Sequence, residues 1–217
     1  MSNNDSFIDE VSEEVRRERL FHLLRRYGWI AIVVVVLLVG GAAFWEYQRA
    51  QDRAEAAAFG DGIVAALALE TPEERRDALL SMEAQGTRRA LVVMLAADQL
   101  EDDTARQTTR DELDAIASEE SLPQIYRQLA VLKSVMLAQA DTAPEEVISR
   151  LDPLTAPGAP YRLLAVEQQA LAHVRAGDRD AAIALLGDIL SADELTRDLQ
   201  QRARQLTVAL GGSLDAT

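Results

Sequence analysis

The chain of 217 residues contains no cysteine, one lysine and two histidines, and only 5% of its residues are aromatic. The absence of cysteine excludes disulfide bridges, thiolate nucleophiles and thiolate metal ligands. The sequence also has no HExxH motif, no glycine-rich phosphate loop and no GxSxG motif, so it lacks the residue patterns of common hydrolases and nucleotide-binding enzymes. We therefore expect no enzymatic activity, no cofactor, no metal and no small-molecule substrate.

Basic side chains are also fewer than acidic ones. The chain has 36 acidic and 22 basic residues, which gives a net charge of −14. Most of this excess lies after residue 45, and no basic stripe interrupts it, so nucleic acid is not an expected partner. The acidic triplet at 101–103 lacks the spacing of a calcium-binding loop, and solvated helix faces account for the other carboxylates.

One run of residues, from Trp29 to Trp45, carries no charge. Its aliphatic side chains each favour insertion into lipid by roughly 0.3–0.6 kcal/mol, with no charged residue to oppose them. A helix extended to Tyr27 and Tyr47 is about 30 Å long and places aromatic rings at both membrane interfaces. We predict a transmembrane helix over residues 28–47. The residues expected to anchor it at the interfaces are Arg25, Arg26, Tyr27, Trp29, Trp45 and Tyr47.

Two other interpretations of this run are a buried core helix and a cleaved signal peptide. The signal peptide is supported by Gly41 and Ala43 before Phe44, which suit a cleavage site. A permanent anchor is favoured because 28 patterned and partly acidic residues precede the run and aromatic residues follow the small ones. Arginine is more frequent before the run than after it, which marks the cytoplasmic side. The prediction is a single-pass protein of a bacterial inner membrane, with a cytoplasmic N-terminus and its bulk in the periplasm.

Residues 1–27 are predicted to form a cytoplasmic amphipathic arm. Phe7, Val11 and Val15 recur every four residues, and Ser6 with Asp9 resembles a capping box. Two interpretations stay open. The arm is either a helix that lies on the membrane or docks on a partner, or a solvated extension whose basic end only sets the topology.

Helix start and stop signals recur through residues 48–217. Two segments are typical of helix N-termini, namely Thr71-Pro72-Glu73-Glu74 and Ser191 with Glu194. One helix is expected to end at Gly177, and the next is expected to be capped by Asp178. No run shows strand alternation, so this part is predicted to be all-helical, and Gly60 and Gly62 are expected to bend or break its first helix. The predicted pairs are 48–69 with 72–84, 88–100 with 105–118, 122–140 with 144–155, and 159–176 with 179–190, followed by a helix at 193–210.

The sequence also repeats itself. Residues 126–160 align with 161–195 at an offset of 35, and five of the first six positions are identical. A period near 34 residues with two helices per unit is the tetratricopeptide pattern, and such units stack because one hairpin cannot bury its apolar face alone. The predicted fold is all-α: one N-terminal transmembrane helix, then a tetratricopeptide-like right-handed solenoid of about four helix pairs with a C-terminal capping helix.

In a solenoid of this kind, the first helix of each pair lines the concave side. A mixture of apolar side chains, a flexible methionine and a Glu/Arg pair there suits an extended or helical peptide. His173 is expected at a packed position rather than in a reactive site. The alternative is that several of the concave residues only pack against the neighbouring unit. The candidate partner-binding residues are Leu129, Leu132, Met136, Gln139, Leu164, Glu167, Leu171, Val174 and Arg175.

The arm "FIDEVSEEVRRER", the "RYGW" entry to the apolar run, the "FWEY" exit and the degenerate repeats together resemble the YfgM-like family, in a form similar to its alphaproteobacterial branch. This family includes the ancillary subunit of the bacterial SecYEG translocon. The resemblance implies a membrane-tethered periplasmic adaptor or chaperone accessory beside the translocon. It would link secreted chains to folding factors such as a membrane-anchored prolyl isomerase. The alternative is a scaffold subunit of another cell-envelope complex that makes no contact with client chains.

Overall fold

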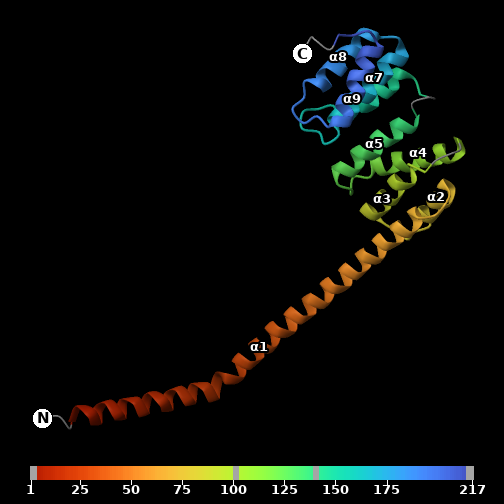
Figure 1. The fold of residues 1–217 in the computed structure, drawn as a ribbon. Helices are drawn as coiled ribbons and strands as arrows, with labels where there is room; N and C mark the ends of the chain where they lie inside the picture. The colour runs from red at the N-terminus through yellow and green to blue at the C-terminus, as the bar shows by residue number, and fades with distance from the viewer. Residues whose placement is uncertain (1–3, 100–102, 139–141, 214–217) are drawn as a thin grey trace. The chain divides into compact units, whose positions relative to one another are not determined.

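The structure is a computed structural model that describes residues 4–99, 103–138 and 142–213. Within the first helix, side chains are described for Arg25, Trp29, Ile30 and from Ile32 onward. All regular secondary structure in these residues is helical, which confirms the predicted class (Figure 1). The chain divides into two compact units, Met1–Asp61 and Gly62–Thr217, and each is described by itself.

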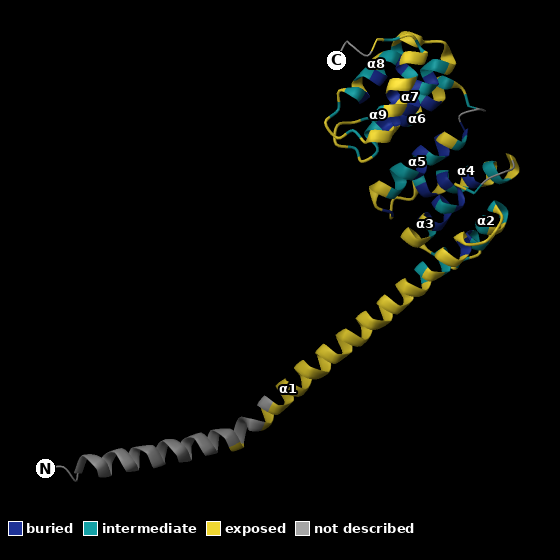
Figure 2. Ribbon diagram, in the orientation of Figure 1, coloured by how far each residue is buried: buried dark blue, intermediate teal, exposed yellow. Residues whose placement is uncertain are grey.

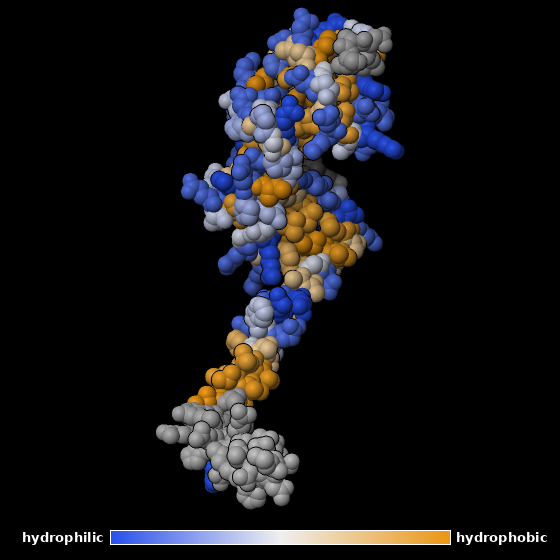
Figure 3. Space-filling view, turned by 90° about the vertical axis from the view of Figure 1, so that its left-hand side faces the viewer, coloured by the Kyte–Doolittle hydropathy of each residue, from blue (hydrophilic) through white to orange (hydrophobic). Residues whose placement is uncertain are grey.

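The first unit consists mainly of helix α1 (Asn4–Leu67), which continues into the second unit. Among the described residues, one helical stretch, Ile32–Leu67, is long and apolar enough to cross a membrane, and its most apolar window contains no buried residue. Figure 3 shows this apolar surface as an orange band. An apolar helix with no protein cover is unlike the core helix of a soluble domain, whose apolar residues are buried.

The expected break at two glycines near the end of α1 is not found. Helix α1 continues through Gly60 and Gly62 to Leu67. A Cβ atom at Gly62 would lie 3.0 Å from the methyl group of Met82. Glycine at this position therefore lets the end of α1 approach the Met82 side chain closely, and it does not interrupt the helix.

The second unit contains the remaining helices, whose bounds lie within a few residues of the predicted ones. They are α2 (Pro72–Leu80), α3 (Gly86–Ala96), α4 (Asp103–Ser118), α5 (Gln124–Ala138), α6 (Pro144–Leu151), the 3₁₀ helix η1 (Asp152–Leu154), α7 (Arg162–Ala176), α8 (Arg179–Leu190) and α9 (Arg197–Ala209).

Local capping explains most of these bounds. Thr71 and Glu74 form the predicted capping box, with both hydrogen bonds at 3.2 Å. Gly177 ends α7 with a left-handed φ of 79°, and the Asp178 carboxylate accepts the backbone N–H of Ala181. Helix α9 begins later than predicted because its N-cap is Thr196, whose hydroxyl accepts the N–H of Leu199. The predicted cap, Ser191, instead donates to the carbonyl of Asp188 in the preceding helix.

Among the described residues, the core of the second unit forms four apolar clusters, each built from consecutive helices. They join the end of α1 with α2 and α3, then α3 with α4 and α5, then α5 with α6 and α7, and finally α7 with α8 and α9. The last helix of each cluster is thus the first helix of the next. Figure 2 shows the corresponding buried residues on the inner faces of the helices. Burial is therefore distributed along the stack, and no single centre holds all of it.

Removal of one core side chain tests this arrangement. Leu113→Ala leaves a cavity at a position with 0% exposure, so we expect a loss of about 2–5 kcal/mol in the free energy of unfolding of the second unit. Val208→Ala removes an exposed side chain and should change it by less than about 0.5 kcal/mol. Urea unfolding followed by circular dichroism measures both, and equal effects would contradict the assigned core.

Candidate functional site

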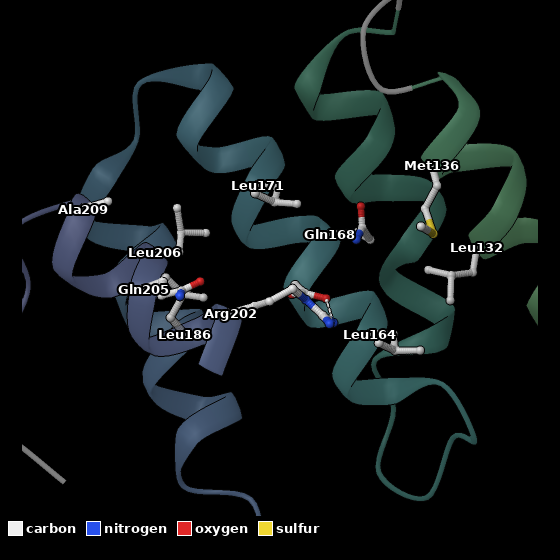
Figure 4. A pocket seen from close by; sticks show the side chains of 11 residues that line it. Leu132, Met136, Leu164, Gln168, Leu171, Leu186, Arg202, Gln205, Leu206 and Ala209 are labelled. Carbon is white, nitrogen blue, oxygen red and sulfur yellow. Dashed lines mark hydrogen bonds and ion pairs between the residues drawn. The ribbon is translucent and has the colours of Figure 1, made fainter. Parts of the chain in front are cut away.

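The main candidate site is a groove of about 690 Å³ between helices α5, α7, α8 and α9 (Figure 4). Most of its lining is apolar, and its polar lining residues are two glutamines, one glutamate and one arginine. The lining residues are Leu132, Met136, Leu164, Glu167, Gln168, Leu171, Leu186, Arg202, Gln205, Leu206 and Ala209.

Helical spacing brings these side chains to one surface. Residues three or four positions apart lie on the same face of a helix. Leu132 and Met136 share such a face on α5, and Leu164, Glu167 and Leu171 share one on α7. Met136 is 53% exposed and Leu164 is 37% exposed, so the groove presents large apolar side chains directly to solvent.

Glu167 and Arg202 form a two-pronged ion pair across the middle of the groove. Arg202 Nε lies 2.7 Å from Glu167 Oε1, and a terminal guanidinium nitrogen lies 2.9 Å from Oε2. Glu167 is only 7% exposed, whereas the Arg202 side chain is half-exposed. The hydrogen bond to Glu167 raises the pKa of Arg202, although partial burial opposes this. The pair joins α7 to α9 and leaves the groove floor without an uncompensated charge.

Five of the nine predicted binding residues line the groove: Leu132, Met136, Leu164, Glu167 and Leu171. Of the other four, three lie outside the lining and one is not described. Leu129 packs against the apolar cluster of α3, α4 and α5, and Val174 is half-buried outside the lining. Arg175 donates a hydrogen bond to the carbonyl of Thr142, and Gln139 lies outside the described residues.

Helix α9 contributes the part of the groove that was not predicted. It supplies Arg202, Gln205, Leu206 and Ala209, whereas the sequence indicated only a capping role for this helix. A signal was present, because Arg202 lies 35 positions after Glu167. If the repeat of 35 residues is extended once more beyond residue 195, Arg202 aligns with Glu167, and such equivalent positions lie on neighbouring helices of a stack.

Side chains are described for four of the residues predicted at the membrane interfaces, and all four are exposed: Arg25, Trp29, Trp45 and Tyr47. The Arg49 guanidinium lies 4.5 Å from the centre of the Trp45 ring, and the Gln51 amide donates to the Tyr47 oxygen at 3.3 Å. The side chains of Arg26 and Tyr27 lie outside the described residues. The contacts at Trp45 and Tyr47 place polar groups beside the aromatic rings, as suits a position at a membrane interface.

Among the described residues, the lining of the groove contains no serine, threonine, histidine or lysine. His173 lies elsewhere, near the end of α7, where its Nδ1 is 3.4 Å from a carboxylate oxygen of Asp178. In the part of the chain that the structure describes, no group of three or more His, Asp or Glu residues is arranged to hold a metal ion.

Comparison of the chain with protein-family models, with curated proteins and with solved structures finds no match. The functional proposal therefore rests on the anchor-like helix, the stacked helices and the groove.

The ion pair in the groove predicts an asymmetric response to mutation. Arg202→Met leaves the buried Glu167 carboxylate without its partner, and we expect it to lower the free energy of unfolding by about 2–4 kcal/mol. Glu167→Gln leaves only the half-exposed Arg202 unpaired and should cost about 1 kcal/mol. Urea unfolding of both variants measures the difference, and the opposite order would contradict the assigned burial of the pair.

Proposed function

We propose that the chain is a membrane-anchored adaptor whose helical unit binds a segment of another polypeptide in the groove between α5, α7 and α9. The groove itself carries this proposal: Met136 and Leu164 are exposed in an apolar concavity whose one carboxylate is already neutralised. Exposed apolar concavities of this size are typical binding sites, and a flexible methionine adapts to different partner side chains.

Two observations support a tetratricopeptide-like solenoid as the framework of this groove. The first is the chain of overlapping apolar clusters, in which each unit packs on its neighbours. The second is a pair of contacts between residues one period apart. The Lys133 ammonium lies 2.6 Å from the Asp98 carboxylate, and Glu167 pairs with Arg202; both pairs are separated by 35 positions.

Helix α9 fits the role of a cap at the end of this solenoid. It buries Leu199, Ala203 and Thr207 against the stack. Its other side exposes mainly polar residues, among them Gln201 and Arg204. A polar outer face on the last helix protects a solenoid from further stacking.

In this proposal α1 holds the protein in a bacterial inner membrane, with residues 1–27 in the cytoplasm and residues 48–217 in the periplasm. The uncovered apolar stretch and the arginines before it support this placement. An anchor confines the groove to a thin layer beside the membrane, which raises its effective concentration there. At this higher effective concentration, a groove that binds peptides weakly can still be occupied.

The resemblance to the YfgM-like family extends the proposal to a specific setting. The chain would be an accessory of the Sec translocon that contacts secreted chains as they emerge. It would link them to periplasmic folding factors such as a membrane-anchored prolyl isomerase. The competing proposal is a scaffold subunit of another envelope complex, which would hold one folded partner and no client chain.

The topology is directly testable because the chain has no native cysteine. A membrane-impermeant maleimide should label a Ser149→Cys variant in intact cells whose outer membrane has been made permeable. It should label Ser12→Cys only after the inner membrane is lysed. The reverse pattern would place the helical unit in the cytoplasm, and a mature chain that begins near Phe44 would replace the anchor with a signal peptide.

The binding role is tested by crosslinking in vivo. A photo-reactive amino acid at Met136 or Leu164 should crosslink to secretory chains during export, and one at Arg204, on the opposite side of α9, should not. Crosslinks to a single folded protein would instead favour the scaffold. If the groove positions gave no more crosslinks than the Arg204 control, a binding role for the groove would be ruled out.

A further inference from the structure

A second pocket, of about 830 Å³, adjoins the groove. It lies between the loop that precedes α7 and the loop between α8 and α9, and Leu164 and Arg202 line both cavities. The two cavities therefore meet at these two side chains. The second pocket differs in character, because its lining includes the three carboxylates of Asp193, Glu194 and Asp198.

These carboxylates outnumber the cations available to them. Two arginines also line the pocket, but Arg202 is held by Glu167. Asp198 also raises the pKa of Arg202 by its charge, so Arg162 and Arg202 together face the three pocket carboxylates and Glu167. Asp193 and Glu194 are exposed and form no ion pair among the described residues. The pocket therefore has an excess of negative charge at the end of an apolar groove.

Capping of α9 does not account for two of these acidic residues. The N-cap of α9 is Thr196, and Asp198 is the acidic residue in its first turn. Asp193 and Glu194 precede the cap, and in the structure neither accepts a hydrogen bond from the first turn of α9. Their carboxylates remain available to a ligand.

Four basic residues of the surrounding helices lie outside the lining of this pocket: Lys133, Arg175, Arg197 and Arg204. Lys133 is paired with Asp98, and Arg175 donates to the carbonyl of Thr142. Arg197 and Arg204 lie roughly 140° and 160° around α9 from Arg202, at about 100° per residue, so they face away from the groove.

From this juxtaposition we propose that the groove selects polypeptide segments in which an apolar stretch is followed or preceded by lysine or arginine. The apolar side chains lie between α5, α7 and α9, and the basic side chain enters the pocket of Asp193, Glu194 and Asp198. This inference rests on the proposed peptide-binding function and adds the chemistry of the partner. The net charge of −14 contributes a long-range attraction to such segments and repels acidic ones.

The test uses the full chain in nanodiscs of uncharged lipid and three fluorescent peptides. The first is a leucine-rich amphipathic peptide with two lysines at one end. The second has glutamine in place of the lysines, and the third has glutamate. We expect the lysine peptide to bind roughly three- to tenfold more tightly than the glutamine peptide, and the glutamate peptide most weakly. This advantage should disappear in about 0.5 M salt, which screens charges at this distance.

Two variants locate the effect. The Asp193→Asn, Glu194→Gln double variant keeps the side-chain shapes and should abolish the advantage of the lysine peptide without changing the binding of the glutamine peptide. The matched control is Glu145→Gln with Glu146→Gln, an exposed acidic pair in the first turn of α6, outside both pockets. The control should preserve the advantage. Circular dichroism verifies that each variant is folded.

A third variant separates this inference from the proposed function. Leu164→Ser should weaken the lysine and glutamine peptides alike. If it does so while the Asp193/Glu194 variant changes neither, the basic partner is overturned and the groove function stands. If Leu164→Ser leaves both affinities unchanged, both proposals are overturned. If the lysine peptide binds empty nanodiscs as tightly as nanodiscs that contain the protein, its affinity comes from the lipid, and this result would also overturn the inference.

Discussion

Each helix of the second unit has to bury apolar residues that one partner helix cannot cover. Helix α5 illustrates the consequence, because Ala130 enters the cluster with α3 and α4, whereas Leu132 and Val135 enter the cluster with α6 and α7. Helix α7 is divided between two clusters in the same way. A helix covered on two flanks has only one remaining face. On α5 and α7 that face carries Met136 and Leu164, so the groove follows from the way the helices stack.

Polar contacts connect the same helices at equivalent positions of the repeat. The Ser134 hydroxyl, with 0% exposure, donates to the Asp114 carboxylate, which also accepts from Arg150. Thirty-five positions later, the buried Gln169 donates to the carbonyl of Ile148 and to the Asp152 carboxylate. Different side chains thus satisfy the same requirement, since a buried polar group costs free energy unless it is hydrogen-bonded. The sequence period is therefore faint although the helical arrangement repeats.

The groove is close to neutral although the chain is strongly acidic. Its one carboxylate, Glu167, is compensated by Arg202, so an apolar segment can enter without covering an unpaired charge. The adjoining pocket instead has three exposed acidic residues in its lining, Asp193, Glu194 and Asp198. In the proposed binding mode, apolar contacts and electrostatic selection would fall to neighbouring surfaces, so that affinity and specificity would depend on different residues.

Much of the fold was predictable because its determinants are local. The uncharged run at Trp29–Trp45, the capping box at Thr71 and the glycine stop at Gly177 each act within one or two helical turns. Five groove residues on α5 and α7 were also predictable, because helical spacing places them on one face. The start of α9 was misplaced because Ser191 and Thr196 are both plausible caps in sequence, and only the packing of Leu199 and Ala203 against α7 and α8 favours Thr196.

The amino-acid sequence by itself determined the helices, their order and the uncharged stretch, since backbone capping and side-chain periodicity depend on near neighbours. Only the tertiary structure decided that α9 completes the groove, that Glu167 is neutralised by Arg202, and that Leu129 and Val174 lie outside the lining. The physical reason is that these outcomes depend on how far each helix is rotated and shifted against the next. The 35-residue repeat indicates which residues can meet, but the packing of helices that are distant in the chain sets that rotation.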